Sequence, residues 1–260
     1  MATKRKVRVD KGRVVHSYRV KSIMHFIIEQ DVVFVDQLQL LFVRYPNSTA
    51  DSRKPTGPTL DVTRVLNLVR KWKDANLIEY EKPYQGQPGF VYATRKGLQD
   101  FGYGHLQYRP RDLSQLDHLR QVNWVRLYVA YWMKQQGYVG NWRWYSERVL
   151  RHMAEQEKDP AKKHPPKYPD AEVIYNNNQS HVAIEVERTR KSFQEYEEIK
   201  ALYEGKTVGS KVWDRATAFH NIWYFHDPSL TTVLQGIFQD PFRLQSFDKL
   251  YLEDGFHLIR

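Results

Sequence analysis

The apolar positions of the first hundred residues follow a helical repeat and then change to short extended runs. Between residues 16 and 30 they recur every three or four positions, which predicts a helix with one buried face. A short β-branched run, Val32–Val35, follows, and Asp36 is expected to cap a second helix that continues through Phe42. The segment 45–58 is rich in turn residues and indicates a loop.

A third helix and a hairpin are predicted next. Thr59 or Asp61 is placed to open the helix, and the periodic apolar residues behind it are expected to be buried. These residues are Val62, Val65, Leu66, Val69 and Trp72. Two extended segments, 76–80 and 90–93, flank a loop that contains Gly and Pro, which is the pattern of a β-hairpin.

The rest of the chain alternates between helical and extended patterns. Ser114 is expected to cap a long helix that ends at Gly137. Strands are expected over residues 171–175, 181–187, 221–225 and 249–252, and helices over residues 193–203, with Phe193 in the apolar set, and 228–238. This order predicts an α/β layer, in which a small central sheet carries flanking helices.

The distribution of charge separates the two parts of the chain. The 260 residues carry a formal net charge of +10. Residues 1–100 hold 18 Lys and Arg against 10 Asp and Glu, whereas residues 101–260 hold 22 against 20. A basic first part predicts contact with a polyanion there, the alternative being a basic surface that only keeps the protein soluble.

Composition also excludes several classes of protein. The sequence contains no cysteine, which excludes a disulfide-stapled scaffold and any zinc or iron–sulfur site with Cys ligands. No apolar run reaches the roughly 18–20 residues of a membrane span, and the basic start is not followed by the apolar stretch of a signal peptide. We therefore expect a soluble protein with no membrane partner.

The helices and hairpin of the first part resemble a winged helix-turn-helix domain. DANLIEYE resembles the exit of a recognition helix into the first wing strand, and YATRKGLQDFG resembles the junction of the second wing strand with a closing helix. Such a domain binds double-stranded DNA through cations on the recognition helix and through the wing. The expected DNA-binding residues are Arg53, Lys54, Arg64, Asn67, Arg70, Lys71, Lys73, Tyr84 and Gln85. A winged helix that contacts proteins instead is the alternative.

Carboxylates are concentrated on one pair of predicted strands. Side chains alternate along a strand, so Glu185 and Glu187 point to the same face, and the neighbouring strand brings Asp170 beside them. Carboxylates so close together repel each other unless a cation joins them, and Mg²⁺ or Mn²⁺ suits oxygen ligands. The three residues are therefore candidate metal ligands, the alternative being that the two glutamates line the solvent face of an edge strand.

Pro169-Asp170 followed by Glu185 resembles the motif of PD-(D/E)XK restriction-endonuclease-like enzymes. The resemblance implies a catalytic site that adds a helical glutamate, for which Glu147 is the candidate. It departs at Glu187, where the active pattern has a lysine whose positive charge supports catalysis. Three basic residues that follow the strand are candidates for the missing charge: Arg188, Arg190 and Lys191. An active Mg²⁺- or Mn²⁺-dependent DNA endonuclease and a degenerate nuclease fold both remain open.

The arrangement as a whole is similar to the replication-relaxation family of bacterial plasmids and mobile elements. The segments that carry the resemblance are LDHLRQVNWVRLYVA, YSERVLR, PDAEV, AIEVERTRKSFQEYEEIKALYE and IWYFHDPSLTTVLQGIF. The family implies an N-terminal winged helix joined to a restriction-endonuclease-like domain, a fold of the α/β (α+β) class, with a role in plasmid replication or mobilisation. It also implies a bacterial, cytoplasmic, DNA-associated protein.

The domain boundaries and partners follow from these segments. We expect a basic arm over residues 1–15, the winged helix over 16–104, a linker over 105–113 and the nuclease-like domain over 114–260. Double-stranded DNA is the expected partner, while a homodimer and contacts with relaxosome, transposition or replication proteins remain open. Two further hypotheses are a non-catalytic regulator or relaxosome accessory protein, and a protein-interaction module with an incidental basic surface.

Overall fold

The chain divides into two compact units, residues 1–111 and 112–260. In this computed structural model the described residues are 14, 16–45, 59–108, 113–156, 168–177, 179–204 and 219–250. The predicted arm, apart from residue 14, and the predicted loop over residues 45–58, apart from Tyr45, lie outside them. Each unit combines helices with a sheet, so the predicted mixed α/β class is confirmed at that level.

The first unit contains the predicted helices. They are α1 (Tyr18–Glu29), α2 (Val35–Arg44), α3 (Val62–Asp74) and α4 (Arg95–Asp100). Ser17 caps α1 by accepting a hydrogen bond from the Val20 amide. Asp61 caps α3, because its Oδ1 accepts from the amides of Thr63 at 2.9 Å and Arg64 at 3.2 Å. The Asp61 alternative for the start of the third helix is confirmed.

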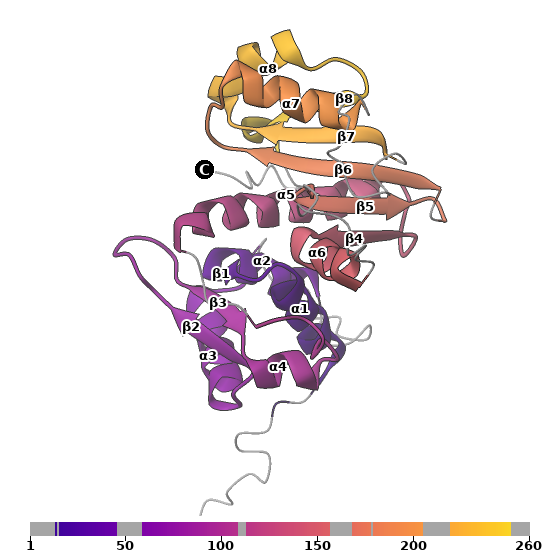
Figure 1. Cartoon of the computed structure of the whole chain (residues 1–260). Coiled ribbons are helices and arrows are strands. Elements are labelled where there is room, and N and C mark those ends of the chain that lie inside the picture. The colour runs from indigo at the N-terminus through magenta and orange to yellow at the C-terminus, as the bar shows by residue number, and fades with distance from the viewer. Residues whose placement is uncertain are drawn as a thin grey trace, which may run out of the picture. The chain divides into compact units, whose positions relative to one another are not determined.

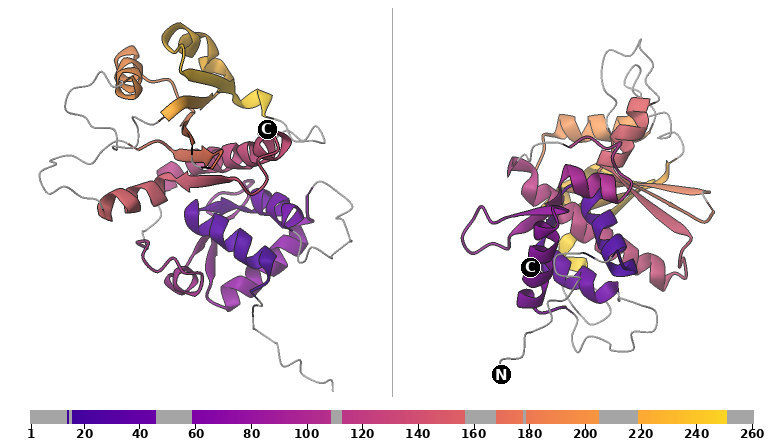
Figure 2. Two further views of the ribbon diagram at one scale, coloured as in Figure 1. Left: turned by 90° about the vertical axis from the view of Figure 1, so that its right-hand side faces the viewer. Right: turned by 90° about the horizontal axis from the view of Figure 1, so that it is seen from below.

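A three-stranded antiparallel sheet completes the first unit. Its strands are β1 (Val33–Phe34), β2 (Ile78–Glu81) and β3 (Phe90–Ala93), in the order β1-β3-β2. The predicted hairpin is therefore confirmed as β2 and β3. The connection over residues 82–89 extends away from the helices of this unit (Figures 1 and 2).

Two predictions about local detail in this unit are wrong. α2 begins at Val35, so Asp36 lies inside its first turn and does not cap it; the Gln37 side chain instead accepts from the Phe34 amide at 3.1 Å. Val62 is 44% exposed although it shares a helix face with Val69, because it is the first residue of α3 and the buried part of that face begins at Val65. In both cases the helix is where the pattern predicts, and the error concerns its first residues.

The second unit is built on a five-stranded sheet. Its elements are α5 (Leu116–Gln135), β4 (Trp142–Ser146), α6 (Glu147–Gln156), β5 (Ala171–Tyr175), β6 (Ser180–Glu187), α7 (Phe193–Tyr203), β7 (Phe219–His226), α8 (Thr231–Ile237) and β8 (Phe242–Ser246). The strand order is β4-β5-β6-β7-β8, which can be followed in Figure 1. β4, β5 and β6 pair antiparallel, whereas β7 and β8 are added in parallel.

Both faces of this sheet are covered by helices. On one face, Tyr196 and Ile199 of α7 and Leu234 of α8 form a buried cluster with Ala183 and Tyr224 of the sheet. On the other face, aromatic rings of α5 contact β7: Trp132 meets Trp223 with ring centroids 4.9 Å apart, and Tyr128 meets Phe225 at 6.1 Å. Apolar area buried on both faces stabilises the sheet.

Several boundaries in the second unit differ from the predicted ones. Ser114 lies in a short 3₁₀ turn, Leu113–Gln115, so it does not cap α5, while Gly137 does end that helix with φ +81°. β4 was not predicted as a strand, and the last strand lies at 242–246 instead of 249–252, where Phe247–Lys249 is a 3₁₀ turn and residues 251 and 252 are outside the described range.

Phe193 opens α7 and is 68% exposed, so this member of the predicted apolar set lies outside the buried face of the helix. Across the described ranges, none of the helices combines the length and the apolar character needed to cross a membrane.

Candidate functional site

The antiparallel pairing of β4, β5 and β6 brings three strand ends to one edge of the sheet. Ser146 at the end of β4 pairs with Ala171 at the start of β5, and Ala171 pairs with Ile184 near the end of β6. The residues just beyond these positions are Glu147 and Asp170, whose backbones are joined by a 3.0 Å hydrogen bond from the Glu147 amide to the Asp170 carbonyl. Sheet topology therefore gathers carboxylates that are distant in sequence.

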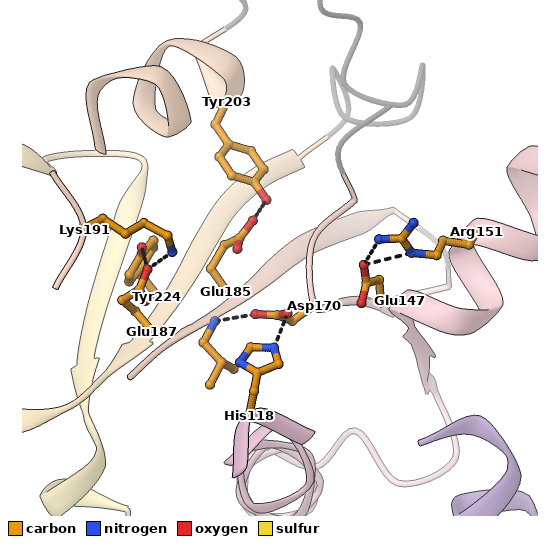
Figure 3. Close-up of polar contacts among 10 residues, drawn as sticks. His118, Glu147, Arg151, Asp170, Glu185, Glu187, Lys191, Tyr203 and Tyr224 are labelled. Carbon is orange, nitrogen blue, oxygen red and sulfur yellow. Dashed lines mark hydrogen bonds and ion pairs between the residues drawn. The ribbon is translucent and has the colours of Figure 1, made fainter. Parts of the chain in front are cut away.

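Asp170 is held at both of its carboxylate oxygens. Oδ2 accepts a hydrogen bond from the Val186 amide at 2.7 Å, and Oδ1 lies 2.8 Å from Nε2 of His118 in α5 (Figure 3). The Asp170 side chain is 15% exposed. An ionised carboxylate only accepts hydrogen bonds, so the facing His118 nitrogen carries the proton.

The electrostatic environment of His118 shows which carboxylates lie near it. Burial favours the neutral imidazole and lowers its pKa, but the charge of Asp170, the hydrogen bond to it, and the charges of Glu147 and Glu185 together outweigh burial and raise the pKa above its usual range. The net direction is upward because three acidic side chains act on one imidazole. His118, Asp170, Glu147 and Glu185 therefore form one electrostatic group, which we call the carboxylate site.

The two glutamates of the carboxylate site are also anchored. Glu147 begins α6 and accepts from Arg151 one turn later, with Nε at 2.9 Å from Oε1. Glu185 accepts from the hydroxyl of Tyr203, the last residue of α7. Burial raises the pKa of Tyr203 well above its usual range, and the charge of Glu185 raises it further, so this phenol stays protonated and donates.

Glu187 and Lys191 contact each other beside the carboxylate site. Glu187 is 5% exposed, and its Oε2 receives the Lys191 ammonium and the Tyr224 hydroxyl, the latter at 3.2 Å. Burial and the adjacent charge of Glu187 raise the pKa of Tyr224, so its hydroxyl also stays protonated. Figure 3 shows Lys191 directed toward Glu187, with Asp170 and Glu147 farther along the strand ends. The predicted catalytic residues thus form two groups. Glu147, Asp170 and Glu185 belong to the carboxylate site, whereas Glu187 pairs with Lys191.

The donor chemistry of the carboxylate site suits a hard divalent cation, because Asp170, Glu185 and Glu147 offer only oxygen atoms. Among the described residues, no cluster of three or more acidic, histidine or cysteine side chains has the spacing of a metal site. Each carboxylate is instead turned toward a partner from the chain: His118, Tyr203 or Arg151. The Mg²⁺ or Mn²⁺ expectation therefore remains a prediction.

The first unit presents a second candidate surface on α3. Val65, Val69 and Trp72 face the core, and the polar residues between them are exposed. The exposed predicted DNA-binding residues of this helix are Arg64, Asn67, Arg70, Lys71 and Lys73. We call this set the α3 surface.

Three of these side chains already have partners within the first unit. Arg70 donates to Asn67 at 3.2 Å, and Lys73 lies 3.0 Å from Glu79 of β2. The remaining predicted contacts lie outside α3. Tyr84, which is 49% exposed, and Gln85 occupy the β2–β3 connection, while Arg53 and Lys54 fall outside the described residues.

Compared with protein-family models, with curated proteins and with solved structures, the chain shows no match.

Sequence reasoning missed the residues that hold the carboxylates. His118 lies 52 positions before Asp170, and only the packing of α5 against the sheet brings them together. A second pair of the same kind occurs on the sheet, where His181 Nδ1 lies 2.6 Å from the fully buried Glu172. Histidine and acidic residues on separate elements could have indicated such pairs, but the sequence does not reveal which of them lie in contact.

Proposed function

We propose that this protein binds double-stranded DNA through its first unit, acting as a winged helix. The observation that supports this most directly is the α3 surface, which places Arg64, Arg70, Lys71 and Lys73 on the solvent side of one helix. Cations on a helix that fits a DNA groove supply phosphate contacts, and Asn67 offers an amide to a base edge.

The adjoining hairpin supports the same proposal. β2 follows α3 after only a short turn, and Lys73 of the helix is paired with Glu79 of the strand, so helix and hairpin form one continuous structure. The extended connection over residues 82–89 exposes Tyr84 and Gln85 at its tip. In this proposal they contact the DNA backbone beside the groove that α3 would enter.

For the second unit we propose a PD-(D/E)XK-like nuclease domain with Asp170, Glu185 and Glu147 as its acidic residues. Support comes from the edge of the sheet, where antiparallel pairing gathers the strand ends that carry Asp170 and Glu147 and where both, with Glu185, act on His118. These three carboxylates would hold Mg²⁺ or Mn²⁺, which supplies an activated water and offsets negative charge on a phosphodiester. Arg151 and Tyr203 orient two of the carboxylates by direct hydrogen bonds.

A non-catalytic DNA-binding accessory protein is the second candidate. One observation favours it: the strand position that carries lysine in active PD-(D/E)XK enzymes is Glu187, and the nearby Lys191 is paired with that glutamate. A lysine used in this way offers its charge to Glu187. In either form, we propose, on the resemblance to the replication-relaxation family, that the protein acts at plasmid or mobile-element DNA.

Two experiments test the proposal. Fluorescence anisotropy with a labelled duplex measures binding, and an affinity that does not fall as salt rises would refute phosphate contacts. Incubation with supercoiled plasmid and Mg²⁺ or Mn²⁺ measures cleavage beside the Asp170→Ala, Glu185→Ala double variant. Cleavage by the wild-type protein alone supports the nuclease, equal cleavage by both exposes a contaminant, and cleavage by neither favours the accessory protein.

A further inference from the structure

β6 lacks the basic residue that the PD-(D/E)XK resemblance requires. Glu187 occupies the position where the resemblance requires lysine, and three basic residues downstream were candidates to replace it. The structure gives two of them other partners: Lys191 contacts Glu187, and Arg188 lies 3.3 Å from Asp117 in the first turn of α5. These two side chains therefore pair with carboxylates outside the carboxylate site.

Two basic side chains from other elements contact the carboxylate site: Arg151 of α6 donates to Glu147, and His118 of α5 faces Asp170. His118 Nε2 lies 2.8 Å from Asp170 Oδ1, and the charges of Glu147 and Glu185 act on the same imidazole. The imidazole is about a third exposed, with 30% of its side-chain surface accessible, whereas the Asp170 side chain is 15% exposed. A hydrogen bond in such a partly enclosed place fixes the orientation of the carboxylate.

The first turn of α5 is attached to the sheet at two consecutive residues. Asp117 receives Arg188, which directly follows β6, and His118 meets Asp170, which directly precedes β5. The helix axis is fixed farther along by contact of its aromatic rings with β7. His118 is thus set by a rigid helix at the strand ends, and its position does not depend on a surface loop.

The backbone and His118 divide the two oxygens of Asp170. The Val186 amide donates to Oδ2 and His118 Nε2 faces Oδ1, so hydrogen bonds at both oxygens fix the orientation of the Asp170 carboxylate. Each carboxylate oxygen has about two acceptor sites, so one on each oxygen stays available to a further ligand. Groups that orient a ligand in this way commonly contribute 10–100-fold to metal affinity, as a general order of magnitude.

We propose that His118 is the positioning residue of the carboxylate site: it holds Asp170 in the orientation that receives a divalent cation and supplies the basic side chain that β6 lacks. This inference rests on the proposed metal-dependent function. His118 acts through Asp170, so its removal is expected to weaken cation binding while the fold persists. Substitution by glutamine retains an N–H the same number of bonds from Cβ as Nε2 and is expected to preserve much of the effect.

The test measures Mn²⁺ binding by isothermal titration calorimetry on the full chain. His118→Ala is expected to weaken binding about 10–100-fold, and His118→Gln is expected to recover most of that loss. His152→Ala, a histidine on α6, is the matched control and is expected to bind as the wild type does. Equal affinity of wild type and His118→Ala, with binding lost in Asp170→Asn, would overturn the role of His118 and leave the proposed function intact.

A second measurement does not need the metal. The thermal midpoints of His118→Ala, Asp170→Asn and the double variant form a cycle, and the two shifts are expected not to add because the residues are in contact. Additive shifts would show that the contact does not position Asp170 and would overturn the inference. Failure of the wild type to bind Mn²⁺ at all would remove the proposed metal function and the role of His118 together.

Discussion

Removing two cations from the α3 surface tests whether this helix contacts DNA phosphates. The change is Arg70→Gln with Lys71→Gln. Both side chains are exposed and neither is ion-paired to an acidic residue among the described residues, whereas Lys73 is already paired with Glu79 and so is a poorer choice. Glutamine is shorter than arginine or lysine but is polar and suits a helix, and both positions are exposed, so the buried face of α3, with Trp72, is expected to be unaffected.

The expected change in the salt dependence of DNA affinity follows from the release of counterions from DNA phosphates. Each phosphate neutralised contributes about 0.9 to the slope of log affinity against log salt, so losing two contacts lowers the slope by about 1.8. Between 50 and 200 mM salt, the wild-type protein should then lose about 12-fold more affinity than the double variant. Fluorescence anisotropy with one labelled duplex, titrated at four salt concentrations, gives both slopes.

A matched control separates local contact from net charge. Arg243→Gln with Lys249→Gln removes the same two charges from exposed positions on β8 and the turn after it, in the second unit. This control should keep the wild-type slope. An unchanged slope in the α3 variant, or an equal decrease in both variants, would refute the assignment of α3 as the DNA-contacting helix.

Three further predictions concern stability. Asp61→Ala removes the cap of α3 and should lower the free energy of unfolding by about 1 kcal/mol in urea titrations, with Asp61→Asn close to wild type. Leu234→Ala, at a fully buried position under the sheet, should cost about 2–5 kcal/mol; a loss below 1 kcal/mol would contradict that packing. Hydrogen bonds from Ser229 lower the pKa of Asp227 in the folded protein below its ordinary value of 3.8. The ionised carboxylate therefore stabilises the fold at pH values above 3.8, and this stabilisation is lost as the pH falls through the lowered pKa of the folded state. Asp227→Asn should therefore be less stable than wild type at pH 7, and the two midpoints should converge in acid.

Elements whose signals are local could be predicted from the sequence. α3 and α7 have periodic apolar residues, and each is preceded directly by a capping residue, Asp61 and Ser192 respectively. The hairpin has its Gly- and Pro-containing connection between two apolar runs. Such signals act over a few residues, so reading them does not require knowledge of the fold.

The first turns of helices were less predictable because several residues there offer similar caps. Ser114 is a good capping residue, but a 3₁₀ turn, which uses the same start signals, occupies its position before α5 begins. At α2 the amide of Phe34 is satisfied by Gln37 from inside the helix, and Asp36, the more typical cap, accepts a hydrogen bond from the Gln37 amide. The competing partners differ by about 1 kcal/mol or less, which sequence inspection does not resolve.

The last strand was misplaced for a different reason. β8 has the alternation of a half-buried strand, with Phe242 buried and Arg243 exposed, but it becomes a strand only by pairing in parallel with β7. β4 likewise gains its partner from β5, about 30 residues later in the chain. Edge strands depend on such distant pairing, so a short polar-apolar segment alone does not distinguish them from a helix start.

The carboxylate site shows the same division between local and distant information. Strand alternation was enough to place Glu185 and Glu187 on one face, yet their contacts differ. Glu185 accepts from Tyr203 and acts on His118, whereas Glu187 is buried and accepts from Lys191 and Tyr224. An unpaired carboxylate in Glu187's position would be costly, so the lysine that follows β6 is used to neutralise it. If the second unit is a PD-(D/E)XK-like domain, as proposed, a glutamate at the lysine position both removes a positive charge from the site and pairs with Lys191, one of the candidate substitutes. A basic group for Asp170 has to come from another element, and α5 is the element that provides one.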